Sequence, residues 1–297
     1  KKRKRDSSEE PQEENKGKGK KRARKKEQLS QQAFIDFSQA PLSETLASLY
    51  EEDLSFLREH QKEPFTKIIE KLGSDIPRGL CVMPTGSGKT ALMAQTISSI
   101  EKRRPNTSII IVVPSVDLVK QTKKKLEDYS EFLSPLKSIQ VGTWCSYEIP
   151  SLKNIMVTTQ KSWLNLYQKS ITAYPTEDSY KKAIHTIRES NQTKISRDLY
   201  FSPFADNFII VDEAHHLGAN KTKHTINHII NDLSINKPII GFSATVSDYD
   251  LPIEEITKLE LSEGIACRAI SPLRVLNVNF SMFKEAKRLR KKLQITR

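Results

Sequence analysis

The chain has 297 residues, of which 37% are hydrophobic, so it can bury a substantial core. Its longest apolar runs, Ile109 to Val113 and Phe208 to Val211, are far shorter than the ~20 residues that span a bilayer, and no secretory signal opens the sequence. Cys81, Cys145 and Cys267 are scattered, without the paired spacing of a metal site. We therefore expect a globular protein without a membrane segment, in a reducing intracellular compartment.

The formal charge of +12 is concentrated at the two ends of the chain. Residues 1–30 carry a net +7 and residues 284–297 a net +6, which leaves −1 for everything between them. Residues 1–30 contain almost no apolar side chains, so we predict a disordered basic tail. Two basic clusters within residues 1–26 suit a nuclear import receptor or a polyanion, and predict a nuclear protein. The alternative is a solvated tail with no targeting role.

Residues 31–73 are predicted to form N-terminal helices. From Asp53 to Leu72 the apolar residues recur at helical spacing, with Pro64 among them. Proline removes a backbone donor and clashes with the preceding turn, so we expect one helix to end and another to begin there.

Beyond Gly73 short apolar runs alternate with longer helical segments, which predicts an α/β domain with a mostly parallel sheet covered on both faces. The region from Trp163 to Ala205 is polar without a clear period and is predicted to be a surface insertion. The expected strands are Leu80–Met83, Ile109–Val113, Ile139–Val141, Ile155–Val157, Phe208–Val211 and Ile239–Phe242. Ligands of such sheets bind at the carboxyl ends of the strands.

A glycine-rich turn with a lysine and a threonine follows the first strand, at Pro84 to Thr90. Gly86 and Gly88 let backbone amides approach a triphosphate, and the following helix points its positive end at it. Lys89 supplies a cation for the β and γ phosphates, and the Thr90 hydroxyl can bind magnesium. The predicted phosphate-binding residues are Thr85, Gly86, Ser87, Gly88, Lys89 and Thr90. Met83 replaces the first glycine of the strict pattern.

Two carboxylates follow the apolar strand that ends at Val211. We expect Asp212 to hold magnesium and Glu213 to orient and deprotonate an attacking water, with Lys89 completing the catalytic set. The alternative is a pair of acids that merely caps the next helix.

Several smaller signals favour structural roles. His224 and His228 are four residues apart in an expected helix, but no third zinc ligand is evident, so we interpret them as helix-surface residues. The side chains of four aromatic residues offer surfaces on which bases could stack, although scattered aromatics more often belong to a core or its rim. They are Trp144, Trp163, Tyr167 and Tyr174.

The string Asp212 to His215 resembles the DEAH box of superfamily-two helicases, and Ser243 to Thr245 resembles their SAT motif. Leu57 to Gln61 resembles the segment in which a glutamine reads adenine. Val113 to Ser115 and Val157 to Gln160 resemble the strand-end motifs that hold a sugar-phosphate backbone. Five ordered motifs over residues 54–280 are far more specific than any one alone. Within the superfamily, three features are most similar to the type III restriction enzyme Res subunit group of helicases and translocases. They are the Gln61 segment, the histidine pair His215-His216 and the segment that begins at Ala269.

This resemblance implies the first RecA-like domain of a P-loop NTPase, a three-layer sandwich over residues 74–280. It implies that Gln61 contributes to adenine specificity and that His215, Ser243 and Thr245 couple hydrolysis to strand movement. Backbone contacts would come from Pro114, Ser115, Thr158 and Thr159.

The implied function is an ATP-dependent helicase or translocase that uses ATP and Mg²⁺ and moves on nucleic acid, with DNA as the expected track and RNA as the alternative. The rival hypotheses are the motor subunit of a restriction system and a nuclear nucleic-acid-binding module with little ATPase activity. Such motors close two RecA-like domains on ATP. The sequence starts at Lys1 and ends about fifty residues after Thr245. We expect a fragment, with residues 281–297 forming a basic linker toward a second domain that supplies arginine fingers, and with weak hydrolysis on its own.

Overall fold

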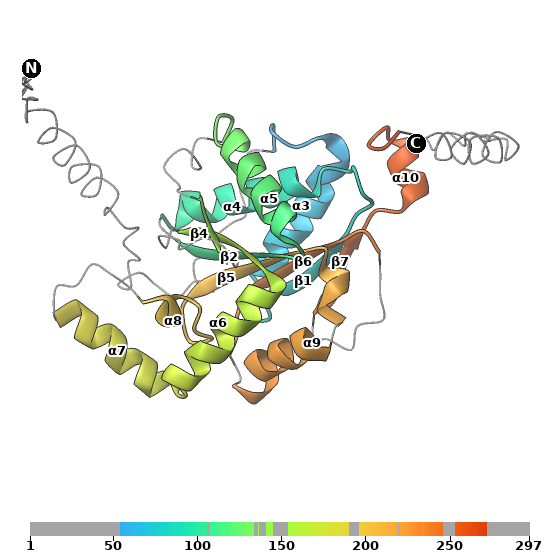
Figure 1. Cartoon of the computed structure of the whole chain (residues 1–297). Coiled ribbons are helices and arrows are strands. Elements are labelled where there is room, and N and C mark those ends of the chain that lie inside the picture. Colours follow the sequence, from blue (N-terminus) through green and yellow to red (C-terminus); the bar gives the residue numbers. More distant parts are fainter. Residues whose placement is uncertain are drawn as a thin grey trace, which may run out of the picture.

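The computed structural model describes residues 54–105, 107–133, 136, 141–144, 154–189, 196–218, 220–233, 235–245 and 253–271. The predicted basic tail (1–30) and the predicted linker (281–297) lie outside these ranges, as do residues 31–53 of the predicted N-terminal helices. Within the described part, helices cover both faces of one sheet (Figure 1).

The sheet has seven strands in the order β3-β4-β2-β5-β6-β1-β7, and every pairing is parallel. The predicted α/β class and parallel sheet are therefore confirmed. The strands are β1 (Arg78–Val82), β2 (Ser108–Val113), β3 (Val141–Trp144), β4 (Ile155–Thr159), β5 (Asn207–Asp212), β6 (Ile239–Ser243) and β7 (Glu254–Lys258). β7 was not predicted, because this edge strand is mostly polar and only Thr257 in it is fully buried.

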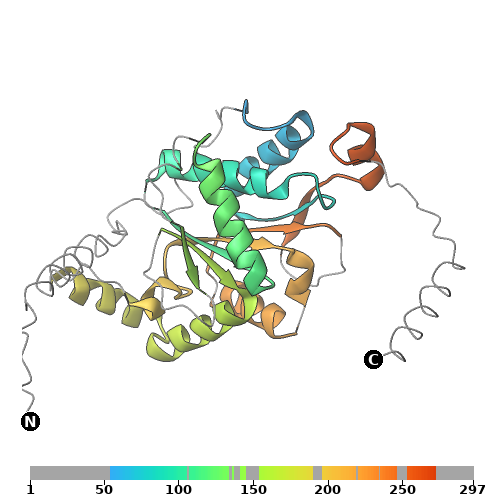
Figure 2. The ribbon, with the colours of Figure 1, turned by 45° about the horizontal axis from the view of Figure 1, so that its top comes forward.

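Helices α3, α4 and α5 lie on one face of the sheet, and α6, α8 and α9 lie on the other (Figures 1 and 2). The helices are α3 (Glu59–Leu72), α4 (Lys89–Arg103), α5 (Val116–Tyr129), α6 (Gln160–Ala173), α7 (Glu177–Glu189), α8 (Arg197–Tyr200), α9 (Asn220–Asn227) and α10 (Leu261–Ala266). A 3-10 helix, η2 (Ala214–Gly218), and a π-helical turn, η3 (His228–Asp232), follow β5 and α9. Among these described helices, none has the length and apolarity needed to cross a membrane.

Successive residues of the central strands serve two separate cores. In β2, Ile109, Ile111 and Val113 pack toward α3, α4 and α5, whereas Ile110 and Val112 pack toward α6 and the segment after α8. All six residues of β2 are buried. A strand that is covered on both faces needs apolar side chains at every position, which explains why it reads as a continuous apolar run.

Pro64 does not divide the N-terminal helical region, which corrects the prediction. A single helix, α3, runs from Glu59 to Leu72 with Pro64 inside it, and the residues just before Glu59 form a turn. An interior proline costs about 3 kcal/mol. Burial of Phe65 and Ile68, each worth about 1.5 to 3 kcal/mol, offsets that cost. Tertiary packing therefore keeps this helix continuous.

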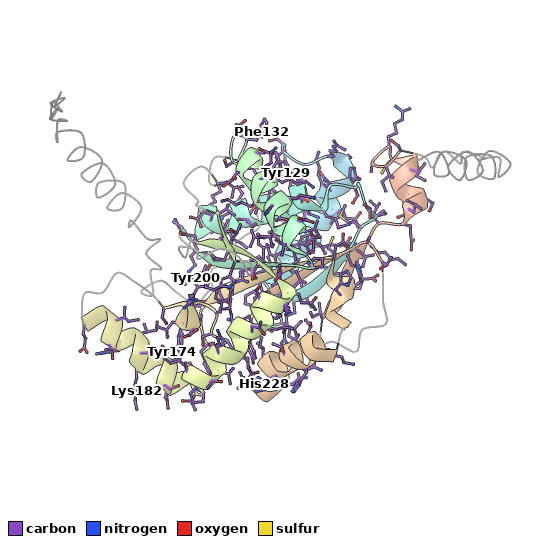
Figure 3. The ribbon with its side chains drawn as sticks, viewed as in Figure 1. Tyr129, Phe132, Tyr174, Lys182, Tyr200 and His228 are labelled. Atoms are coloured by element: carbon purple, nitrogen blue, oxygen red, sulfur yellow. The ribbon has the colours of Figure 1, made fainter. Side chains whose placement is uncertain are left out.

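The sequence predicted that the segment from Trp163 to Ala205 is a surface insertion. In the structure only part of this segment lies at the surface. Trp163 in α6 is only 2% exposed and belongs to the core beneath β2 and β4. α7 projects from the body, and its Tyr180 packs with Tyr174 at the end of α6 in a small satellite core (Figure 3). Polar residues lie between the buried residues of α6 and α7, so the helical spacing of the apolar residues was not recognised in the sequence.

A buried polar cluster closes the amino edge of the sheet, opposite the strand ends that carry the motifs. Lys237 is 3% exposed, and its Nζ donates to the Ala205 carbonyl at 2.5 Å and to Asn207 Oδ1 at 2.8 Å. Beside it, Arg104 forms an ion pair with Asp206 at 2.7 Å. Burial lowers the pKa of Lys237 to about 7, partly opposed by the charge of Asp206. The amine thus loses its proton far more easily than in water.

This pKa predicts a pH-dependent stability between pH 7 and pH 8.5. Above pH 7 the folded protein releases the Lys237 proton while the unfolded chain retains it, so the free energy of unfolding should rise with pH, by at most about 1.4 kcal/mol per unit. Lys237→Met should flatten this rise, measured by urea unfolding at several pH values. The matched control is Lys182→Met on exposed α7 (Figure 3), which should keep the wild-type slope. Equal slopes in all three proteins would contradict the assignment.

Candidate nucleotide site and the adjoining sheet edge

Three neighbouring strands bring the predicted nucleotide motifs together at the carboxyl edge of the sheet. β6 lies between β5 and β1, with Asp212 opposite Phe242 and Val82 opposite Ser243. The backbone N–H of Met83, just past β1, donates to the Ser243 carbonyl at 2.8 Å. The glycine-rich turn, the carboxylate pair and the SAT-like segment are therefore adjacent in space although they are far apart in sequence.

The turn between β1 and α4 has the backbone form of an anion-binding nest. Gly86 and Gly88 have φ values of 88° and 91°, in the left-handed region that side chains rarely adopt. No atom lies within 4 Å of the position that a Cβ on Gly86 would take, so the crest of the turn is open. α4 begins at Lys89 without a side-chain cap, so its first amides are free to bind an anion. Ser87 is buried and its hydroxyl donates to the Pro84 carbonyl at 2.8 Å, which braces the turn.

Lys89 lies at the base of this nest. Its side chain is 9% exposed, and Nζ donates to the Met83 carbonyl at 3.2 Å. Thr90, the next residue of α4, is half-buried, whereas Thr85 on the turn is exposed. The ammonium group is close enough to oppose the rise in the pKa values of Cys81 and Asp212. Lys89 therefore places a positive charge between the nest and the carboxylates.

Asp212 and Glu213 form a strained carboxylate pair at the end of β5. Burial, and then the charge of Glu213, raise the pKa of Asp212. Its Oδ1 accepts a hydrogen bond from the Glu213 backbone N–H at 3.0 Å. Glu213 has a φ of 51°, a left-handed conformation that costs a non-glycine residue about 1 to 2 kcal/mol. Strain of this kind persists where the surroundings fix a side chain for a task.

His215 bridges the carboxylate pair to the SAT-like segment. Its Nδ1 lies 3.4 Å from Glu213 Oε2 and 3.4 Å from Ser243 Oγ. The Ser243 hydroxyl also donates to the Thr245 carbonyl at 2.7 Å. One imidazole nitrogen thus links a change at Glu213 to the segment that follows β6.

The residues before α4 are fastened to α3 by two side chains. Gln61 is 2% exposed; its Nε2 donates to the Ser87 and Gly88 carbonyls, each at 3.1 Å, and its Oε1 accepts from the Arg58 N–H at 2.9 Å. His60 Nε2 lies 2.9 Å from the same Ser87 carbonyl. In this structure the Gln61 amide holds the glycine-rich turn. His60 was missed in the sequence, where only its place next to Gln61 hinted at a role.

The strand ends at β2 and β4 place some of the predicted backbone-binding residues at the surface. Pro114 is half-buried, and Ser115 is exposed and caps α5 by accepting from the Leu118 N–H at 3.3 Å. Thr159 caps α6 in the same way, accepting from the Ser162 N–H at 3.2 Å, but it is buried, with 7% of its surface exposed. Thr158 has no exposed surface, so its side chain is not presented at this edge.

The structure places the histidine pair and the aromatic residues in different surroundings. His228 Nδ1 is hydrogen-bonded to the Tyr167 hydroxyl, and His224 lies one element earlier, in α9. No group of three metal-binding side chains occurs among the described residues. Of the four aromatic residues, Trp163 and Tyr167 are buried in the core, and Trp144 remains half-buried at the sheet edge.

The site fits a nucleotide and a divalent cation on chemical grounds. Open amides and a buried lysine suit a polyphosphate. The paired carboxylates repel one another, and a cation held by Asp212 and Thr90 would relieve that repulsion.

The parallel sheet, its two helical layers and the turn before α4 define a RecA-like α/β fold of the P-loop class. Residues 55–248 match the family model described as "Type III restriction enzyme, res subunit", and the chain belongs to this family.

The chain is also similar to individual proteins over limited stretches. A segment of 76 residues is 32% identical to the DNA 3'-5' translocase XPB2 of Sulfurisphaera tokodaii, covering 26% of this chain and 15% of that protein. The structure of a DUF1998 helicase, MrfA, bound to DNA has a TM-score of 0.47 at 14% identity, over 75% of this chain and 30% of that one. The Sulfolobus solfataricus SWI2/SNF2 ATPase core in complex with double-stranded DNA has a TM-score of 0.38 at 16% identity, over 64% of this chain and 32% of that one. This chain spans less than a third of each.

The contact between α3 and the glycine-rich turn predicts unequal costs for two glycine substitutions. Gly86→Ala and Gly88→Ala should each lower the free energy of unfolding by about 1 kcal/mol, because an alanine is strained at positive φ. A Cβ at position 88 would in addition collide with Gln61 Nε2. Gly88→Ala should therefore be the more destabilising in urea unfolding.

A double-mutant cycle isolates that collision. In a Gln61→Ala background the cost of Gly88→Ala should fall to that of Gly86→Ala. If Gly88→Ala costs the same whether or not Gln61 is present, the contact has no energetic role.

Proposed function

We propose that this chain is the ATP-binding RecA-like domain of a superfamily-two, DEAH-type motor that couples ATP hydrolysis to movement on nucleic acid. The observation that carries the proposal is the convergence of the nest before α4, the Asp212–Glu213 pair and Ser243 on the adjacent strands β1, β5 and β6. A phosphate loop alone is shared by kinases, GTPases and motors. The His215 bridge from the carboxylates to the strand end favours a motor, because it connects hydrolysis to a second segment.

In this proposal each group has a distinct task. The amides of Thr85 to Lys89 bind the phosphates, and Lys89 moves from the Met83 carbonyl to the β and γ phosphates. Thr90 and Asp212 would hold a magnesium ion, which would neutralise charge on the phosphates. Glu213 orients the attacking water and accepts its proton.

Gln61 would have two alternative partners. The resemblance to superfamily-two helicases implies that this glutamine hydrogen-bonds to adenine. In this structure its amide donates instead to the Ser87 and Gly88 carbonyls. Adenine binding would therefore require an exchange of partners, in which the amide leaves at least one of these carbonyls. His60 remains bonded to Ser87 and keeps α3 attached to the turn meanwhile.

We propose DNA as the preferred track. The support is the family description as a restriction-enzyme subunit and the similar stretch in a protein described as a DNA translocase. Ser115 and Thr159 would contact the sugar-phosphate backbone together with Pro114 and the amino ends of α5 and α6. Thr158 has no exposed surface, so it would support the neighbouring Thr159 from within β4 and would not contact the nucleic acid itself.

Four broader assignments belong to the same proposal. Residues 31–73 carry the Gln61 segment, residues 74–280 form the ATP-binding domain, and residues 281–297 lead to a second RecA-like domain. The clusters within residues 1–26 direct the protein to the nucleus through an import receptor. Localisation of a reporter fused to the chain with and without residues 1–26 would separate a nuclear repair or remodelling motor from the motor subunit of a restriction system.

The role of Glu213 is tested by the conservative change Glu213→Gln. It removes the proton acceptor and keeps the size, so ATP turnover should fall by at least about a hundredfold while ATP affinity stays near wild type. Turnover is measured by phosphate release at high enzyme concentration, and affinity by titration with a fluorescent ATP analogue. The control Lys89→Ala should lose the binding itself. Unchanged turnover in Glu213→Gln would reject the assigned role, and would favour a binding module with little ATPase activity.

The bridging role of His215 predicts a selective defect. His215→Ala should leave ATP affinity unchanged and lower the ratio of DNA-stimulated to unstimulated turnover, because the path between Glu213 and Ser243 is interrupted. His185→Ala is the matched control, since this imidazole is exposed on α7, whereas the His216 ring lies 4.1 Å from the His215 ring and its removal would disturb it. An equal effect of both changes, or of neither, would argue against coupling through this imidazole. Single- and double-stranded DNA and RNA are compared as stimulators in the same assay.

A further inference from the structure

A cavity of about 270 Å³ opens beside the edge strand β3, away from the nucleotide site. It lies between the end of β3, one face of α6 and the start of α8. Its lining is amphipathic and consists of Trp144, Ser162, Asn165, Leu166, Lys169, Arg197 and Asp198. No step of the proposed hydrolysis uses these residues.

One side of the cavity carries an aromatic ring with a guanidinium over its face. The Arg197 guanidinium carbon lies 5.1 Å from the centre of the Trp144 ring, and Phe201 supports that ring edge-on at 6.1 Å. The Trp144 side chain is half-buried and Arg197 is exposed. Because Arg197 is exposed, the side of its guanidinium that faces away from the Trp144 ring is open to a ligand. Aromatic rings and guanidinium planes are the surfaces on which nucleobases stack in single-strand binding proteins.

The remaining walls carry polar groups in a row along α6. Asn165 and Lys169 are exposed, four residues apart, and thus on one face of the helix. A carboxamide can both donate to and accept from a base edge, and an ammonium group suits a phosphate. Asp198, on the opposite side, can accept a hydrogen bond from an exocyclic amine. With two cations and one anion, the lining suits a ligand that carries a single phosphate and a planar polar ring.

The cavity adjoins the surface proposed for the nucleic-acid backbone. Trp144 ends β3 directly beside Thr158 in the register of β4. Ser162, on the rim, is hydrogen-bonded through its hydroxyl to Thr159 Oγ1 at 2.9 Å. A strand whose phosphates lie at the amino end of α6 would therefore have a base within reach of the cavity. The volume is slightly below the range of about 300 to 1,000 Å³ that holds drug-sized ligands, so it suits one base with its sugar.

We propose that this cavity binds one unpaired nucleotide of the track, with its base stacked on the Trp144–Arg197 wall and its phosphate near Lys169. The proposal rests on the proposed function, because the ligand belongs to the strand held at Ser115 and Thr159. The cavity would bind only a base that is not stacked within a helix, and a fully paired duplex has no such base. The site would thus let the motor distinguish single-stranded from duplex regions.

The first experiment measures tryptophan fluorescence during titration with a 12-nucleotide single strand, a blunt 12-base-pair duplex of DNA, and free nucleoside monophosphates. The chain has two tryptophans, and Trp163 is 2% exposed, so a base that stacks in the cavity should quench Trp144 selectively. Trp144→Phe keeps an aromatic wall and should bind the single strand with near wild-type affinity but without that quenching. The single strand should quench at concentrations where the duplex and the free nucleotides do not.

The second experiment compares affinities by fluorescence anisotropy of labelled strands. Trp144→Ala and Arg197→Ala should each weaken binding of the single strand about tenfold and leave the duplex unaffected. Arg197→Lys keeps the positive charge but removes the planar guanidinium, so it should weaken binding of the single strand as much as Arg197→Ala does. Lys182→Ala on exposed α7 (Figure 3) removes one charge at a residue that does not line the cavity and is the matched control. Urea unfolding of each variant verifies that the fold is intact.

The outcomes separate this proposal from the proposed function. Binding of the single strand without quenching, and with unchanged affinity in Arg197→Ala, would overturn the cavity proposal while the motor proposal stands. An equal loss of single-strand and duplex binding would reduce Arg197 to a general cation and would also overturn it. Quenching by free nucleotides alone would assign the cavity to a small molecule instead. Failure of every nucleic acid to bind would reject the track and the cavity together.

Discussion

Parallel hydrogen bonding between β5, β6 and β1 determines where every chemical group of the proposed nucleotide site lies. In a parallel sheet all strands end at the same edge, so the groups that follow these three strands meet there without any sequence proximity. The bond from the Met83 N–H to the Ser243 carbonyl extends that ladder one residue beyond β1 and fixes the start of the glycine-rich turn against β6. A shift of register between β6 and either neighbour would separate the anion nest, the carboxylates and the SAT-like segment.

The left-handed backbone at this edge is held in place by the packing beneath it. The positive φ values at Gly86, Gly88 and Glu213 all occur where a strand turns abruptly into a helix or 3-10 turn. The strands behind them are buried on both faces, so neither end of the turn can relax. α3 adds a second restraint, because Gln61 and His60 hold the Ser87 carbonyl from outside the sheet. The nest is thus held from the side by a helix that precedes the sheet in sequence.

The two halves of the carboxyl edge present different chemistry. The half formed by β5, β6 and β1 carries buried charge, with Lys89 and Asp212 close together. The half formed by β2 and β4 presents helix amino ends capped by Ser115 and Thr159, with little formal charge. This arrangement agrees with the near-neutral net charge of the middle of the sequence, since helix amino ends and hydroxyls can hold phosphates without cationic side chains. The Trp144 cavity extends the second half around the edge strand.

The sequence by itself determined the α/β class, five of the seven strands and the order of the motifs, because apolar runs and glycine-lysine turns follow from local chemistry. The strand predicted over Ile139–Val141 shares only Val141 with β3. Tertiary structure decided what depended on packing. α3 continues through Pro64 because the helix buries Phe65 and Ile68, and Trp163 belongs to the core because α6 covers β4. Burial also withdrew the Thr158 side chain from the surface. Contacts between segments far apart in the chain, such as Gln61 with Ser87 and Trp144 with Arg197, leave no periodic signal, so only the folded chain reveals them.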